Sequence, residues 1–255
     1  MNTSIFTRYL YYKNDVVLSF ILCILKKDIE QSLFWGYELY YSGFKEEVFD
    51  ILISTYENYF EKLNSKKIKS FIENKKIEWK KNINKHSILA TIIHNIATRD
   101  NNTNNDCSII DPLSTKKKII YAVYREKNVE KYKTFDNMDE SSIKIPPYRI
   151  LQLVCKYSII KNGYEYLIYD FIKPYLNTIP REQLCEYYFY HWEYYAYYTP
   201  LWKKRIDKYN GYIDVEKRQV VFNNDELEDL FYKQYGYEPD EQPNEITEKT
   251  IGKKE

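Results

Sequence analysis

The strongest constraint on the fold is a succession of helical segments separated by short stops. Asp15 can cap a first helix, and Asp28 can cap a second helix that ends at Gly43. From residue 46 to 63, apolar side chains recur at spacings of three and four residues, the pattern of a helix with one buried face. Further segments of this kind follow, with short turns between them. The sequence therefore predicts an all-α protein, an irregular antiparallel array of helices, of which a HEAT-like α-solenoid is one form.

Similar stops mark the later helices. Asn64 or Ser65 can cap a lysine-rich helix, Pro200 opens a short helix, and Asn224 or Asp225 can cap the last one. In that last helix, the residues expected on the buried side are Leu227, Leu230, Phe231 and Tyr235.

Little of the chain has the pattern of a strand or of a linker. Residues 212–222 alternate between apolar and polar side chains, which predicts a small β-hairpin. We expect residues 1–238 to form a single helical domain, with a subdivision near residues 100–145 as the alternative, because the helical pattern is weakest there. Residues 239–255 are polar and acidic in balance, so they are expected to form a disordered tail.

Aromatic side chains are concentrated in one stretch, where nine of the twelve residues from Tyr187 to Tyr198 are Tyr, Phe or Trp. Successive residues of a helix turn by about 100°, so rings at this density surround the helix and cannot all face one groove. The favoured interpretation is an interior helix whose tyrosine hydroxyls find partners. Two alternatives stay open, a platform that stacks on single-stranded nucleic acid and a tyrosine-lined groove for a protein segment. The nucleic-acid alternative requires interleaved basic residues, which come only after the run.

The overall charge excludes the simplest electrostatic partners. The chain has 38 Lys and Arg against 37 Asp and Glu, a net charge of +1, so bulk charge indicates neither nucleic acid nor membrane. The longest apolar run, Val16 to Leu25, has about ten residues, whereas a membrane span needs about twenty. No membrane partner is therefore expected. Four cysteines lie far apart without metal-ligand spacing and are expected to be reduced thiols: Cys23, Cys107, Cys155 and Cys185.

One helix carries a local concentration of positive charge. The segment from Lys62 to Lys81 contains eight lysines, against Glu73 and Glu78. The favoured interpretation is a solvated outer face of a helix, and the alternative is contact with RNA phosphates without sequence reading. In that alternative, the nucleic-acid residues are Lys66, Lys67, Lys69, Lys75, Lys76, Lys80 and Lys81.

Residues with catalytic or metal-binding chemistry come together at only one place in the sequence. His191 has Glu186, Glu193 and Cys185 nearby, but Glu186 and His191 are five residues apart and do not share a helix face cleanly. The sequence contains no glycine-rich phosphate loop, nucleophile elbow or His-Glu-x-x-His pattern. We therefore predict no catalytic, metal or cofactor site, and a protein that is not an enzyme.

A short motif suggests a protein partner. The segment YRILQLV, from Tyr148 to Val154, resembles the Tyr-x-x-x-x-Leu-hydrophobic helix with which translation-initiation scaffolds bind the cap-binding protein. The residues that would make this contact are Tyr148, Leu153 and Val154, and the same residues also fit a buried helix stripe.

Two stretches of the chain resemble a known group of proteins. They are SLFWGYELYYSGF, from Ser32 to Phe44, and the segment from Pro200 to Gln242. Both resemble an uncharacterised protein group of the nucleocytoplasmic large DNA viruses, and the tyrosine-rich composition is similar to that of mimivirus-like members. The resemblance implies a viral protein in the host cytoplasm or viral factory and implies no activity. We expect an interaction scaffold in viral gene expression, at translation initiation or transcription, with a capsid-associated virion component as the alternative.

Overall fold

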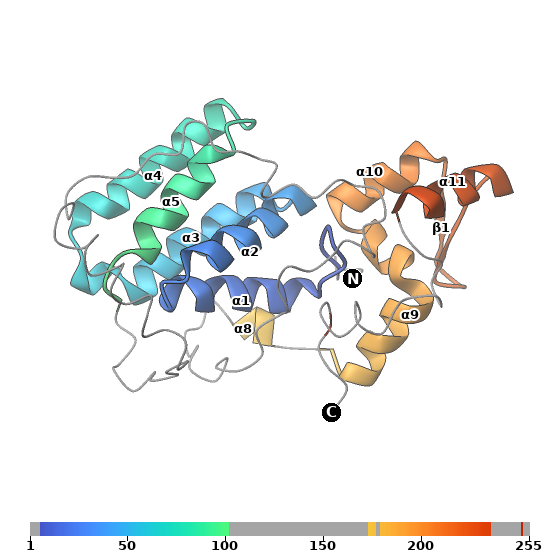
Figure 1. Ribbon diagram of the computed structural model, residues 1–255, viewed down its shortest axis with the longest axis horizontal. Coiled ribbons are helices and arrows are strands. Elements are labelled where there is room, and N and C mark those ends of the chain that lie inside the picture. Colours follow the sequence, from blue (N-terminus) through green and yellow to red (C-terminus); the bar gives the residue numbers. More distant parts are fainter. Residues whose placement is uncertain (1–5, 102–172, 177–178, 236–250, 252–255) are drawn as a thin grey trace.

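The computed structural model describes residues 6–101, 173–176, 179–235 and 251 (Figure 1). Its longer helices are α1 (Lys13–Leu25), α2 (Ile29–Ser42), α3 (Lys45–Tyr59), α4 (Lys66–Lys81), α5 (Ser87–Ala97), α9 (Arg181–Tyr197), α10 (Pro200–Lys208) and α11 (Asp225–Tyr235). The short elements are the 3-10 helix η1 (Glu61–Leu63), helix α8 (Lys173–Leu176) and the strands β1 (Tyr212–Asp214) and β2 (Gln219–Val221). These strands pair antiparallel as a two-stranded sheet. The predicted all-α fold, helical array and small hairpin are confirmed.

The first helix begins earlier than its predicted cap. Asp15 was expected to cap it, but α1 starts at Lys13, and Asp15 lies in its first turn with 1% of its surface exposed. Helical hydrogen bonding already begins at Tyr12, whose carbonyl accepts from the Val16 N–H. An acidic side chain in the first turn stabilises a helix by interacting with the positive end of the helix dipole. The cap position and the first turn therefore both favour aspartate, and the sequence alone does not distinguish them.

Helix α2 has the predicted ends. The Asp28 carboxylate accepts a hydrogen bond from the Gln31 N–H at 3.1 Å, and Gly43 ends the helix with a φ of 105°. Because only residues 26–28 separate α1 from α2, the two helices pack side by side in opposite directions (Figure 1). Gly36 permits this close packing, since a Cβ there would lie 2.7 Å from Ile93 Cδ1 and 3.0 Å from a Phe20 ring carbon.

Helices α4 and α5 complete the N-terminal group. Ser65 caps α4 by accepting from the Lys67 N–H at 3.3 Å, as one of the two predicted caps. The Trp79 indole of α4 donates to the Tyr40 hydroxyl at 3.0 Å, which ties α4 to α2. Helix α5 packs against each of α1–α4 and is buried over most of its length, so it forms the centre of this group.

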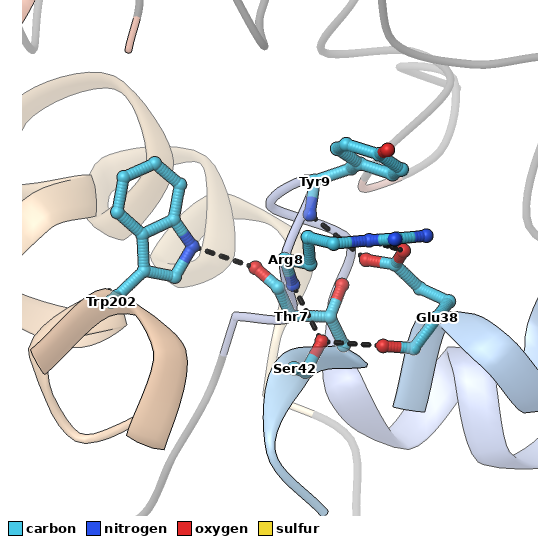
Figure 2. A network of polar contacts seen from close by, with 6 residues as sticks. All are labelled: Thr7, Arg8, Tyr9, Glu38, Ser42 and Trp202. Atoms are coloured by element: carbon cyan, nitrogen blue, oxygen red, sulfur yellow. Dashed lines mark hydrogen bonds and ion pairs between the residues drawn. The ribbon is translucent and has the colours of Figure 1, made fainter. Parts of the chain in front are cut away.

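The segment Phe6–Tyr12 connects the N-terminal group to α9–α11 (Figure 1). We call it the strap, because every one of its residues is buried. On one side, the Trp202 indole of α10 donates to the Thr7 carbonyl at 2.9 Å (Figure 2). On the other side, Arg8 and Tyr9 bind Glu38 of α2. The strap therefore holds both helical groups through hydrogen bonds as well as apolar packing.

The C-terminal group packs around large aromatic side chains. The ring centroids of Trp192 and Trp202 are 5.1 Å apart, and Phe231 of α11 stacks 6.2 Å from Trp192. Asn224 caps α11 by accepting from the Leu227 N–H at 2.9 Å, as one of the two predicted caps. The prediction that Leu230 is buried is wrong, because its side chain is 51% exposed. It lies off the stripe of α11 at positions 227, 231 and 235 that faces the core.

The predicted domain limits fall largely outside the described residues. The alternative boundary near 100–145 lies almost wholly in residues 102–172, so the single domain over 1–238 stays a prediction. Within the predicted tail 239–255, the structure describes Ile251 alone. This residue is buried, and its carbonyl accepts from Arg181 Nη1 at 2.7 Å.

Candidate interaction surfaces

The lysine-rich face of α4 is largely neutralised by carboxylates. Lys69 Nζ lies 2.9 Å from Glu57 Oε1 and 3.5 Å from Glu61 Oε1. The other pairs join Lys75 to Glu78, Lys76 to Asp50 and Lys80 to Glu46. The hydrogen bond to Glu57 raises the pKa of Lys69, and those from Lys75 and Lys85 lower the pKa of Glu78. These lysines carry their charge beside a carboxylate, so they are less available for phosphates.

Three of the predicted nucleic-acid residues keep an unpaired charge. In the part of the chain that the structure describes, Lys66, Lys67 and Lys81 are exposed and form no ion pair. Lys66 and Lys67 lie at one end of a groove of about 700 Å³ that extends to Glu78. The described lining of this groove comes from α4 alone, which is one face of a helix and not an enclosed site. The structure therefore reduces the predicted basic patch to its two ends.

The predicted partner-binding residues Tyr148, Leu153 and Val154 lie outside the described residues. Their role in binding a protein stays a prediction.

The residues around His191 point to different neighbours. Glu186 is exposed and lies 3.6 Å from Arg218, whereas Glu193 is buried and accepts from the Tyr232 hydroxyl at 2.9 Å. His191 occupies a kink in α9, with φ −144° and ψ 22°. Among the described residues, no group of three His, Cys, Asp or Glu side chains is arranged to hold a metal ion.

The aromatic helix α9 exposes one face before His191, whereas its residues from His191 to Tyr197 are buried or partly buried. Tyr188, Trp192 and Tyr194 are buried, as the interior-helix interpretation requires, but Tyr190 is 60% exposed. The kink at His191 changes the direction of the helix after this residue. Tyr187 and Tyr195, one on each side of the kink, stack with ring centroids 3.8 Å apart and remain partly exposed. The expectation of a helix buried on every side is therefore wrong for this face.

The β-hairpin packs beside the exposed face of α9. Arg218 Nη1, at the end of the hairpin turn, lies 3.6 Å from Glu186 Oε1 of α9. Tyr190 is four residues after Glu186 and shares its face of the helix. Val215 begins the four-residue turn that Arg218 ends, because Asp214 pairs with Gln219, and Val215 is 59% exposed. Each of the two elements that this half-exposed ion pair joins therefore carries an exposed apolar side chain.

We call this region the α9–hairpin surface and define it by Glu186, Tyr187, Tyr190, Tyr195, Val215 and Arg218. Burial is the largest cause that raises the pKa of Tyr195, and the Arg218 charge partly offsets it, which places Tyr195 near the guanidinium. The sequence pattern predicts both the aromatic helix and the hairpin. It gives no sign that they meet, since their contact joins residues 32 positions apart, from 186 to 218.

The fold and this surface define the described part of the chain as an all-helical array with an exposed aromatic and charged surface at its hairpin end. Comparison with protein-family models, with characterised proteins and with solved structures finds no match to this chain. None of the described helices combines the length and the apolar character required to cross a membrane.

Proposed function

We propose that the protein is a non-enzymatic interaction scaffold that binds a protein partner through the α9–hairpin surface. The observation that supports this most directly is the exposure of Tyr190 and Val215, at 60% and 59%, beside Arg218. Tyrosine and arginine are enriched among the residues that contribute most to protein–protein binding, while isolated exposed apolar residues are ordinary. The proposal therefore depends on their grouping around one ion pair.

The chemistry of the surface suggests what a partner presents. Tyr190 and Val215 offer apolar area for an aliphatic side chain, and Arg218 offers a guanidinium for a carboxylate. The ion pair between Arg218 and Glu186 has both side chains 51% exposed, so it contributes little to stability and a partner carboxylate can replace Glu186. We therefore propose a protein segment with an aliphatic residue close to an acidic one.

The resemblance to a protein group of large DNA viruses supports a role in viral gene expression, in the host cytoplasm or viral factory. That role is at translation initiation, for which the segment with Tyr148, Leu153 and Val154 would supply the contact, or at transcription. A capsid-associated virion component is the second candidate, because tyrosine-rich helices and balanced charge suit a packed protein shell equally well.

The test is a tagged pull-down of the full chain from infected cells, with and without nuclease, read by mass spectrometry. Wild-type protein is compared with the variant Tyr190→Ala/Arg218→Glu. The matched control is Lys62→Glu/Leu63→Ala, which makes the same kinds of change at exposed positions on η1. We expect the wild-type protein to recover initiation factors or polymerase subunits both with and without nuclease. The variant Tyr190→Ala/Arg218→Glu should lose these partners, and the control should keep them. Capsid proteins alone would establish the virion role, and equal recovery by both variants would exclude this surface.

A contact with RNA is proposed only for the ends of α4. Lys66, Lys67 and Lys81 are the cations there without a carboxylate partner within the described part of the chain. Binding that depends on so few phosphate contacts would be weak, and each contact contributes about 0.7 to the slope of log affinity against log salt for a single strand. A partner that disappears on nuclease treatment would indicate this route.

A further inference from the structure

Two arginines from distant parts of the chain lie where the strap meets α10. Arg8 is next to Thr7, whose carbonyl accepts from the Trp202 indole at 2.9 Å. Arg205 is three residues after Trp202 and lies on the same face of α10, with its guanidinium carbon 4.6 Å from the Trp202 ring centroid. The charges of Arg8 and Glu38 act on Arg205, which places all three in one electrostatic neighbourhood.

Glu38, the one carboxylate that the described residues bring to this neighbourhood, is already occupied. Glu38 Oε2 accepts from Arg8 Nε at 2.9 Å, and Glu38 Oε1 accepts from the Tyr9 N–H at 2.8 Å (Figure 2). Arg8 is only 4% exposed, and its Nη2 has no hydrogen-bond partner although it is shielded from water. Glu38 therefore satisfies only part of the Arg8 guanidinium.

Arg205 has no carboxylate at all within the described residues. It forms no ion pair there, and its Nη1 is buried without a hydrogen-bond partner. The centroid of the Tyr235 ring lies 4.9 Å from the guanidinium carbon of Arg205. An aromatic face attracts the cation but accepts no hydrogen bond from the N–H groups in the plane of the guanidinium, so this contact leaves them unpaired. A largely buried cation without a carboxylate partner among the described residues is costly, so an anionic group placed beside Arg205 would stabilise this part of the fold.

The cluster carries an excess of positive charge. Burial lowers the pKa of Arg205 to about 10, with Arg8 contributing in the same direction, so Arg205 remains a cation at neutral pH. Among the described residues, Glu38 thus offsets the charge of Arg8, and the charge of Arg205 is not offset by an ion pair. The Thr7 hydroxyl, next to Arg8, is also buried without a hydrogen-bond partner. Arg205 is partly exposed, whereas Thr7 and Arg8 are buried, so Arg205 is the member of the cluster that solvent reaches.

We propose that Arg8, Arg205 and Thr7 form a binding site for a small tetrahedral oxyanion of the phosphate type. The donors come from two segments of the chain, the strap and α10. A tetrahedral anion presents acceptor oxygens in several directions, whereas a planar carboxylate matches one guanidinium fork. The bound anion links the strap to α10 and so fastens the C-terminal group, which carries the α9–hairpin surface, to the N-terminal group.

The experiment is thermal unfolding and calorimetric titration of the full chain with inorganic phosphate at constant ionic strength. We expect saturable binding and a rise in Tm with phosphate concentration. Arg205→Met keeps the length of the side chain but removes its charge, and we expect at least tenfold weaker phosphate binding. Arg205→Lys keeps the positive charge but loses the forked N–H donors of the guanidinium. Its affinity for phosphate should lie between those of the wild type and Arg205→Met. Lys204→Met, which removes a charge from an exposed side chain of the same helix α10, is the matched control and should bind as wild type does.

Three results would overturn the proposal. Phosphate that gives no saturable heat and no change in Tm at constant ionic strength would show that no anion site exists. Phosphate binding by Arg205→Met equal to that of the wild type would place the anion elsewhere. An Arg205→Met variant that is more stable than the wild type and does not respond to phosphate would mean that Arg205 acts through its contacts with the aromatic rings. Acetate that binds as tightly as phosphate would exclude the tetrahedral preference.

Discussion

Arg8 and Glu38 form a buried ion pair, with Nε and Oε2 2.9 Å apart and the two residues 30 positions apart in the sequence. Glu38 also accepts from the Tyr9 N–H, and the Ser42 hydroxyl accepts from the Arg8 N–H while it donates to the Glu38 carbonyl (Figure 2). The pair and its hydrogen bonds therefore attach the strap to one face of α2.

Replacing Glu38 with glutamine should destabilise the protein strongly. The change removes the only counter-charge of Arg8 among the described residues and leaves a buried cation, at a typical cost of about 3–5 kcal/mol. Urea unfolding followed by circular dichroism measures the loss. Glu73→Gln, an exposed glutamate on α4, is the matched control and should change the free energy of unfolding by less than about 0.5 kcal/mol. Equal effects of the two changes would contradict the structural role of the pair.

Removing the acids that face α4 should increase affinity for RNA. Glu46 and Asp50 pair with Lys80 and Lys76, and Glu57 pairs with Lys69, which also lies 3.5 Å from Glu61. Replacing Glu46, Asp50 and Glu57 with amides therefore frees Lys76 and Lys80 and leaves Lys69 with Glu61 alone. We expect tighter binding of single-stranded RNA and a salt slope steeper by about 1.4, from about 0.7 for each of the two freed lysines. Fluorescence anisotropy at several salt concentrations measures both quantities.

The control for this experiment makes the same change of net charge elsewhere. It replaces Glu216, Glu226 and Asp229, which are exposed on the hairpin turn and α11. An equal gain in the control would mean that RNA responds to net charge alone. No gain in either variant would exclude α4 as an RNA-binding helix.

Stability should fall at high pH because partly buried tyrosines, which resist ionisation in the folded chain, ionise when the chain unfolds. Burial is the largest cause that raises the pKa of Tyr41 and that of Tyr175, each to about 12, whereas an unfolded tyrosine titrates near about 10. Their contribution is complete below about pH 10 and is lost as the pH rises to about 12. Tyr41→Phe should therefore shift alkaline unfolding to higher pH.

The midpoint of alkaline unfolding is read by circular dichroism, together with tyrosinate absorbance. Tyr190→Phe removes a hydroxyl from a ring that is 60% exposed and should leave the midpoint unchanged. A midpoint that moves equally in both variants would contradict a role for burial.

Gly43 should not tolerate a side chain. Its φ of 105° strains any residue with a Cβ, and that Cβ would lie 2.6 Å from Pro200 Cβ. Gly43→Ala should lower the free energy of unfolding by about 1–3 kcal/mol. Asparagine tolerates the left-handed backbone conformation better but meets Pro200 as well, so Gly43→Asn should not restore stability. Chemical denaturation measures the free energy of unfolding of both variants. A Gly43→Asn variant as stable as the wild type would show that Pro200 moves aside at little cost.

Local signals in the sequence predicted several helix ends correctly. Asp28, Ser65 and Asn224 accept the N-terminal hydrogen bonds that their residue types favour, and Gly43 ends α2. Such caps depend on atoms within a few residues, which the sequence contains in full. Asp15 is the exception, because the same carboxylate suits a cap and a first turn equally.

The sequence by itself determined the helical character, several helix ends and the hairpin, because these depend on residue spacing and on neighbours along the chain. Only the tertiary structure decided which charges meet. The neighbours of Lys76 and Arg8 lie 26 and 30 positions away, and the exposure of Tyr190 depends on a kink and on how the hairpin lies beside α9. Contacts between distant segments follow from packing in three dimensions, and a pattern along the chain contains no record of them.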